Sequence, residues 1–151
     1  LSEIGRLSVR AVLDLAIGIV EALAYAHDRK IIHRDLKPAN ILLGESKDEH
    51  PRIADFGLAK DWTLKRNLTQ TGDILGTPYY MAPELFRAGA TDLGHHLDIY
   101  SLGAVLYECL TGVRPFQAAT PMLLAQRICR DQPTTLTFSL MANWLPFSSL
   151  S

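Results

Sequence analysis

The sequence predicts a mostly helical α+β fold, in which a few long helices accompany short β hairpins. Apolar residues recur at three- and four-residue steps in three separate segments, which is the spacing of amphipathic helices. Short apolar runs lie between the first two of these segments, and turn-forming residues flank them. The 151 residues are 48% hydrophobic and 21% charged, which is typical of a globular chain and excludes wholesale disorder.

The first predicted helix extends from Ser8 to His27. Its apolar positions follow the helical repeat: Val12, Leu13, Ala16, Ile19, Val20, Leu23 and Ala26. A second helix, strongly apolar and therefore central, is predicted from Ile99, Leu102, Val105, Leu106 and Cys109. Gly112 should end it, because glycine is the usual residue just after a helix. The third helix should begin with Thr120 as its N-cap and Pro121 at its first position.

Short strands are predicted between the first two helices. Lys30–His33 and Ile41–Leu43 should form two brief strands around a polar loop that contains proline, and Arg52–Ala54 should form a third. Residues Gly57–Met81 lose periodicity and are rich in Thr, Asn, Gln, Gly and Asp. They predict one long loop, and loops of that length in compact domains are usually functional or disordered.

The charge balance excludes several classes of partner. With 15 basic and 16 acidic side chains, the net charge is -1, so we expect no nucleic-acid partner. No 18 apolar residues run together, so no membrane span is expected. Cys109 and Cys129 lack metal-type spacing and are interpreted as buried thiols in a reducing compartment, which favours a cytoplasmic location.

Three motifs contain the residues suited to catalysis. His33–Asn40 has the sequence H-R-D-L-K-P-A-N, Asp55-Phe56-Gly57 begins twenty residues after Asp35, and Ala82-Pro83-Glu84 follows. In order, they resemble the catalytic loop, the metal-binding motif and the end of the activation segment in eukaryotic-type serine/threonine protein kinases. The run from Gly112 to Pro121 is more similar to bacterial members of that family.

The resemblance extends from about Ser8 to Arg130 and implies a protein-kinase-like fold. It implies that residues 1–130 are part of a kinase domain, namely the large C-terminal lobe from the catalytic loop to the third helix. Residues 131–151 are then a divergent tail, which has no charged residue from Gln132 to Ser151.

The resemblance also implies roles for single residues. Asp35 would accept the proton of the incoming hydroxyl and Lys37 would neutralise charge on the transferred phosphate. Asn40 and Asp55 would be oxygen ligands to Mg²⁺, and Leu42 would lie under the adenine of ATP. ATP and Mg²⁺ are therefore the expected cofactors, and a protein bearing Ser or Thr is the expected substrate.

Other family positions concern regulation and support. Arg34 would pair with a phosphorylated Thr69 or Thr71, although a polar loop contains threonines in any case. Thr77 would contact the base and the lysine, or simply be a turn residue before Pro78. The remaining family positions are His33 and Phe56 in an interlobe stack, Glu84 as one half of an ion pair, and Asp98 either anchoring the catalytic loop or serving as an ordinary helix-start acid. His95-His96 are interpreted as a solvated loop and not as a metal site.

Some of the family's nucleotide-clamping features are not found in this sequence. Before His33 the glycines are Gly5 and Gly18, which cannot make G-x-G-x-x-G, and the lysine is Lys30. We therefore expect the small lobe to be missing and to come from the full-length protein, with this chain inactive alone. The main hypothesis is a serine/threonine kinase, and the alternative is a non-catalytic kinase-like binding or regulatory protein.

Overall fold

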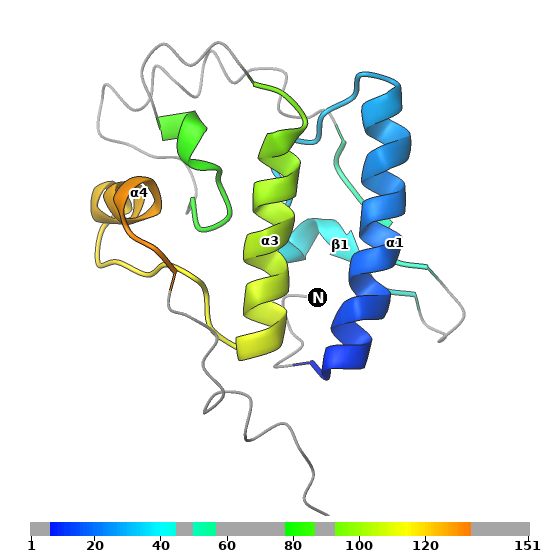
Figure 1. Cartoon of the computed structure of the whole chain (residues 1–151), viewed down its shortest axis with the longest axis horizontal. Coiled ribbons are helices and arrows are strands. Elements are labelled where there is room, and N and C mark those ends of the chain that lie inside the picture. The colour runs from blue at the N-terminus through cyan, green and yellow to red at the C-terminus, as the bar shows by residue number, and fades with distance from the viewer. Residues whose placement is uncertain (1–6, 45–49, 57–77, 87–92, 134–151) are drawn as a thin grey trace, which may run out of the picture.

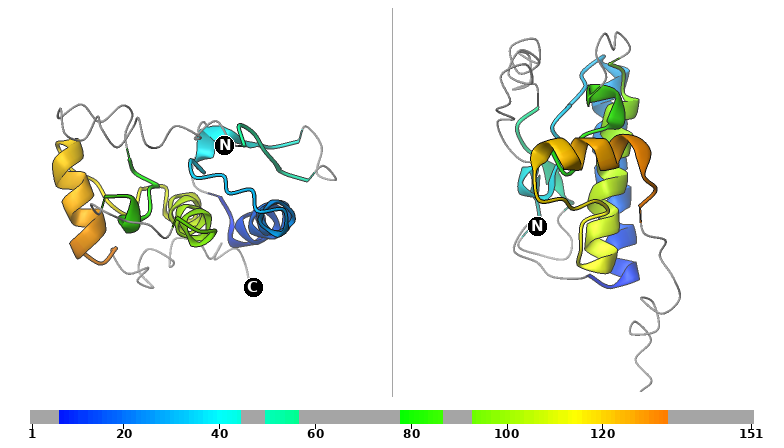
Figure 2. Two further views of the ribbon diagram at one scale, coloured as in Figure 1. Left: turned by 90° about the horizontal axis from the view of Figure 1, so that it is seen from above. Right: turned by 90° about the vertical axis from the view of Figure 1, so that its left-hand side faces the viewer.

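The computed structural model describes residues 7–44, 50–56, 78–86 and 93–133. These residues form three α-helices, two short 3-10 helices and one two-stranded sheet. Helices α1 and α3 lie side by side, and α4 lies on the other side of α3 (Figure 1). The 3-10 helix η3 packs against α4, as the view from above also shows (Figure 2). The predicted α+β class with mostly helical content is observed.

Helix α1 spans Val9–Asp28, close to the predicted range. It begins after Ser8, whose side chain accepts a hydrogen bond from the Ala11 amide at 3.2 Å. Its buried face consists of Val12, Leu15, Gly18, Ile19, Leu23 and Ala26. The prediction was wrong at Leu13 and Val20, which are 55% and 48% exposed. Leu13 and Val20 lie on a second apolar stripe of the helix. This stripe is exposed because α3 and β2 pack against the other face.

Two of the three predicted strands are confirmed. Strand β1, Ile41–Leu42, pairs antiparallel with β2, Arg52–Ile53, so that Ile41 lies opposite Ile53. Residues Lys30–His33 form no strand, which corrects the prediction. Their amide donors are used elsewhere, since Lys30 and Ile31 donate to the last carbonyls of α1 and His33 donates to the Asp98 carboxylate.

The second helix ends, and the third helix begins, at the predicted signals. Helix α3 spans His96–Thr111 and is followed by Gly112 in the left-handed conformation, with φ 76°. Helix α4 spans Pro121–Arg130, and the Thr120 hydroxyl accepts from the Leu123 amide at 3.3 Å. The short helices η1, Pro38–Asn40, and η3, Pro83–Phe86, were not predicted.

Helix α3 separates two apolar clusters, so it is central as predicted. The first lies between α1 and α3 and contains Val12, Leu15, Ile19, Leu23, Leu36, Ile41, Leu102, Val105 and Cys109. The second contains Phe116 together with Leu124 and Ile128 of α4, and Phe86 of η3 packs against it. Leu36 lies within the loop His33–Asn40, called the H-R-D loop below, and Ile41 directly follows it, so their burial fixes that loop against the first cluster.

Several smaller predictions have mixed outcomes. Cys109 is a buried free thiol, but Cys129 is only partly buried. His95 is exposed as expected, whereas His96 is half-buried and begins α3 and therefore does not lie in a loop. The predicted loop 57–81 lies outside the described residues except for 78–81. None of the helices in the described part is long and apolar enough to cross a membrane.

Candidate active site

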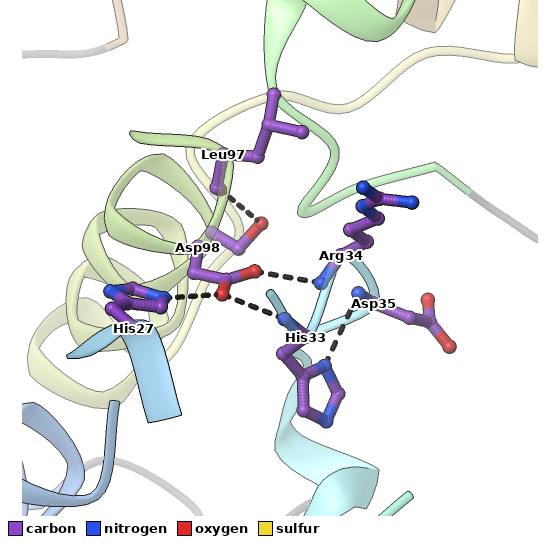
Figure 3. Close-up of polar contacts among 7 residues, drawn as sticks. His27, His33, Arg34, Asp35, Leu97 and Asp98 are labelled. Atoms are coloured by element: carbon purple, nitrogen blue, oxygen red, sulfur yellow. Dashed lines mark hydrogen bonds and ion pairs between the residues drawn. The ribbon is translucent and has the colours of Figure 1, made fainter. Parts of the chain in front are cut away.

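A buried carboxylate on α3 holds the start of the H-R-D loop. Asp98 is fully buried in the first turn of α3, and its Oδ2 and Oδ1 accept from the amides of His33 and Arg34 at 2.8 and 2.7 Å (Figure 3). Oδ2 also lies 2.8 Å from His27 Nε2, which donates to it. The predicted anchoring contact of Asp98 is thus present. It also holds Arg34 in the left-handed region, at φ 65°.

His33 connects the loop to the end of β2. Its Nδ1 accepts from the Asp35 amide at 3.2 Å, so the proton lies on Nε2, which donates to the Ala54 carbonyl at 2.8 Å. The edge of its ring faces Phe56, with 4.9 Å between the ring centroids and 73° between the planes. The expected contact between His33 and Phe56 is therefore present, and it joins residues 33–35 to 54–56.

Asp35 and Lys37 form a close ion pair on the open side of this loop. Lys37 Nζ lies 2.7 Å from Asp35 Oδ2, and the two side chains are 39% and 34% exposed. The Asp35 carboxylate points away from Asp98, as Figure 3 shows. Asn40 stabilises the loop conformation, because its Nδ2 donates a hydrogen bond to the Asp35 carbonyl at 2.9 Å. The loop therefore presents a carboxylate and an ammonium group side by side to solvent.

Asn40 and Asp55 provide oxygen donors of the kind that Mg²⁺ prefers. Because Asn40 Nδ2 is used by the Asp35 carbonyl, its Oδ1 is the atom available to a ligand. The Asn40 carbonyl accepts from the Ala54 amide at 2.8 Å, which brings the loop next to the residue before Asp55. Asp55 is exposed and has φ 62°. One amide oxygen and one carboxylate fit Mg²⁺, which keeps much of its shell for water and phosphate.

The remaining predicted residues are only partly placed. Leu42 in β1 is 53% exposed, and Arg34 Nε is buried without a hydrogen-bond partner. Glu84 is half-buried in η3. Its charge contributes to the raised pKa of Tyr100, although burial of the Tyr100 side chain is the larger cause. Three threonines with predicted roles lie outside the described residues: Thr69, Thr71 and Thr77.

Two polar groupings were not predicted from the sequence. His27 is a third donor to Asp98, yet 71 positions separate the two residues and no local pattern links them. The second grouping is at the base of α3, where the Tyr80 hydroxyl donates to Glu108 Oε2 at 2.5 Å. Arg114 lies 3.5 Å from the other Glu108 oxygen and 3.9 Å from the centre of the Tyr79 ring. Burial, followed by the Glu108 hydrogen bond, raises the pKa of Tyr80 above its usual range.

Comparisons with known proteins identify the family. The sequence-family model of the protein kinase domain matches residues 1–151, so the chain belongs to the protein kinase family. It is 43% identical over 122 residues to the serine/threonine-protein kinase fused of Drosophila melanogaster, which covers 79% of this chain and 14% of that protein. It is 38% identical over 130 residues to the serine/threonine-protein kinase PknB of Mycolicibacterium smegmatis, covering 85% and 20%.

A solved structure supports the same assignment. The crystal structure of Rad53 residues 1–466 in complex with AMP-PNP matches with a TM-score of 0.68 and 29% identity, over 92% of this chain and 32% of that one. Within that family, these relatives place the chain among the eukaryotic-type serine/threonine protein kinases, a group that includes bacterial enzymes such as PknB. The chain spans a fifth or less of the two curated relatives.

Proposed function

We propose that this chain contains the catalytic part of a serine/threonine kinase active site, in the large lobe formed by residues 1–130. The reaction is transfer of the γ-phosphate of ATP to a Ser or Thr hydroxyl of a protein substrate. The observation that supports it best is the Asp35–Lys37 pair, 2.7 Å apart on a loop whose backbone hydrogen-bonds to a buried carboxylate. Phosphoryl transfer needs positioned charge more than covalent chemistry, and this loop offers it.

In the proposed reaction, the Asp35 carboxylate accepts the proton of the substrate hydroxyl. The hydroxyl oxygen bonds to the γ-phosphorus as the bond from that phosphorus to the leaving oxygen of ADP breaks. Lys37 stabilises the negative charge that develops on the transferred group, and its ion pair with Asp35 keeps both groups at one place. Mg²⁺, when bound to Asn40 and Asp55, supplies further charge neutralisation.

Further parts of the proposal concern residues around this centre. Leu42 lies against the adenine, and Arg34 pairs with a phosphorylated Thr69 or Thr71. Thr77 contacts the base and the lysine, and Glu84 is one half of an ion pair. The sequence contains no G-x-G-x-x-G, so residues of the full-length protein supply the nucleotide clamp, and the chain alone lacks transfer activity. The place of action is the cytoplasm, and residues 131–151 are a tail outside the catalytic unit.

A chimera tests the proposed chemistry apart from the clamp. In it, the aligned residues of this chain replace the 130 matching residues of PknB from Mycolicibacterium smegmatis. We expect ATP-dependent phosphorylation of a generic Ser/Thr protein substrate, lost in Asp35→Asn and strongly reduced in Lys37→Met. The matched control is Asp14→Asn, an exposed carboxylate on α1.

The chimera also separates the kinase from the alternative. A chimera that binds ATP, has the helical circular dichroism of PknB and transfers no phosphate would contradict the proposal and favour a non-catalytic binding or regulatory protein. Transfer activity that persists in Asp35→Asn would remove Asp35 as the proton acceptor.

A further inference from the structure

A hollow lined by two arginines lies beside α4, the helix on the far side of α3 from α1 (Figure 1). Its volume is about 430 Å³, and it opens between α4 and the segment just before that helix. Its lining residues on α4 recur at three- and four-residue steps and are exposed, so they share one outer face of the helix: Leu123, Gln126, Arg127 and Arg130. The opposite face is buried through Leu124 and Ile128. None of the described lining residues belongs to the H-R-D loop.

The two arginines of the hollow have no carboxylate partner among the described residues. Other exposed cations in that part of the chain do have one, since Arg10 and Lys37 each lie in an ion pair. Helix α4 contains no Asp or Glu, and there is no charged residue from Gln132 to Ser151. Asp131 also lines the hollow, so two positive charges and one negative charge leave its described lining with a net charge of +1. The chain near α4 therefore leaves positive charge to be matched from outside.

A hydrogen bond orients one of the two guanidinium groups. Arg127 Nη1 donates to the Gln117 carbonyl at 2.6 Å, in the segment that precedes α4. The N–H donors of a guanidinium form a fixed fork, so one bond sets the plane of the group and leaves its other donors available. Arg130 follows on the same face and forms no hydrogen bond to a described residue. Adjacent guanidinium groups with available donors are suited to carboxylates.

Apolar surface lies next to these charges. Leu123 is 48% exposed and lines the hollow together with Ala118 and Ala119. Met122, the preceding residue of α4, is 69% exposed. The helix dipole favours cations in the last turn of any helix, but it gives no reason for apolar side chains to be exposed beside them. The hollow thus suits a segment that combines carboxylates with an apolar side chain.

We propose that this hollow is a docking site for an acidic segment of a partner protein, in which Asp or Glu residues flank an apolar side chain. The carboxylates pair with Arg127 and Arg130, and the apolar side chain lies against Leu123 and the two alanines. The whole chain has a net charge of -1, so it lacks the long-range positive field that attracts nucleic acid. Local charge complementarity favours a protein segment instead. The docking does not depend on the proposed transfer reaction.

Fluorescence anisotropy of the complete chain tests the docking. The probe is a fluorescein-labelled peptide with the sequence G-D-E-L-E-D-G. One matched peptide, G-N-Q-L-Q-N-G, lacks the charges, and the other, G-D-E-S-E-D-G, lacks the apolar side chain. We expect saturable binding of the acidic peptide and weaker binding of both matched peptides. Added salt should weaken the binding of the acidic peptide, because ion pairs at an exposed site are screened.

Substitutions in the hollow locate the binding. Arg130→Gln removes one charge without breaking a hydrogen bond in the described part of the chain, and we expect it to weaken binding severalfold. Arg10→Gln is the matched control, because it removes an exposed arginine of α1 and gives the same net charge. It should leave the affinity unchanged. At the exposed lining residue Gln126, Gln126→Glu should weaken binding and Gln126→Lys should strengthen it.

Four results would overturn the proposal. The acidic peptide could fail to bind, or the uncharged peptide could bind equally well. The affinity could also be unchanged in Arg130→Gln with the circular dichroism of the unmodified chain. Competition by a single-stranded oligonucleotide as effective as that of the unlabelled acidic peptide would assign the hollow to polyanions in general. If Arg130→Gln alters the circular dichroism, the nearly isosteric Gln126→Glu decides, and an unchanged affinity in that variant contradicts the docking equally.

Discussion

The buried carboxylate of Asp98 offers the sharpest test of how the His33–Asn40 loop is held. Asp98→Ala would leave the amides of His33 and Arg34 and the Nε2 of His27 without their acceptor. Each buried donor left unpaired costs about 1–3 kcal/mol, and breaking a buried charged pairing costs about 3–5 kcal/mol in total. Because these contacts share one carboxylate they are not additive, so we expect a loss of about 3–5 kcal/mol in the free energy of unfolding.

Urea unfolding, followed by far-ultraviolet circular dichroism, measures this loss. A domain is typically stable by about 5–15 kcal/mol, so the midpoint for Asp98→Ala should fall by a large fraction at an unchanged slope. Asp98→Asn retains one accepting oxygen and should lose less. Asp14→Ala is the control, because its ion pair with Arg10 is exposed and such pairs contribute about 0.3–0.5 kcal/mol. Equal losses in Asp98→Ala and Asp14→Ala would refute the anchoring role.

Two further predictions concern α3 and its surroundings. Burial and the hydrogen bond to Glu108 raise the pKa of Tyr80, so the free energy of unfolding should fall as pH rises above about 10, where only the unfolded tyrosine ionises. In urea titrations at several alkaline pH values, Tyr80→Phe should reduce this slope, and an unchanged slope would contradict the assignment. Gly112→Ala, just after α3, should destabilise by about 1–2 kcal/mol because of its left-handed backbone, whereas Gly103→Ala within α3 should stabilise by about 0.5–1 kcal/mol. Thermal unfolding measures both, and equal effects would argue against the backbone explanation.

Local signals in the sequence were sufficient for the helices. Ser8, the Thr120–Pro121 pair and Gly112 mark helix ends through hydrogen bonds and backbone angles that involve only near neighbours. The period of apolar residues located the helices but could not choose which stripe is buried. Leu13 and Val20 are therefore exposed, because the buried face depends on where α3 and β2 lie.

Contacts between distant segments decided the rest of the site. Residues 30–33 are apolar and short enough for a strand, but their amides donate to α1 and to Asp98 instead. In the same way, no spacing connects His27 with Asp98 or Tyr80 with Glu108. A hydrogen bond between residues far apart in the sequence exists only once the helices have packed, so a pattern of residue types does not contain it.

The sequence by itself determined which chemical groups the site contains. The types and order of Asp35, Lys37, Asn40 and Asp55 carry the resemblance to protein kinases on which the proposed phosphoryl transfer rests. Only the tertiary structure decided how the loop is held, namely by the packing of α1 against α3, which brings His27 and the loop amides to one buried carboxylate. The physical reason is that a buried charge must be paired, and its partners come from wherever packing places a donor.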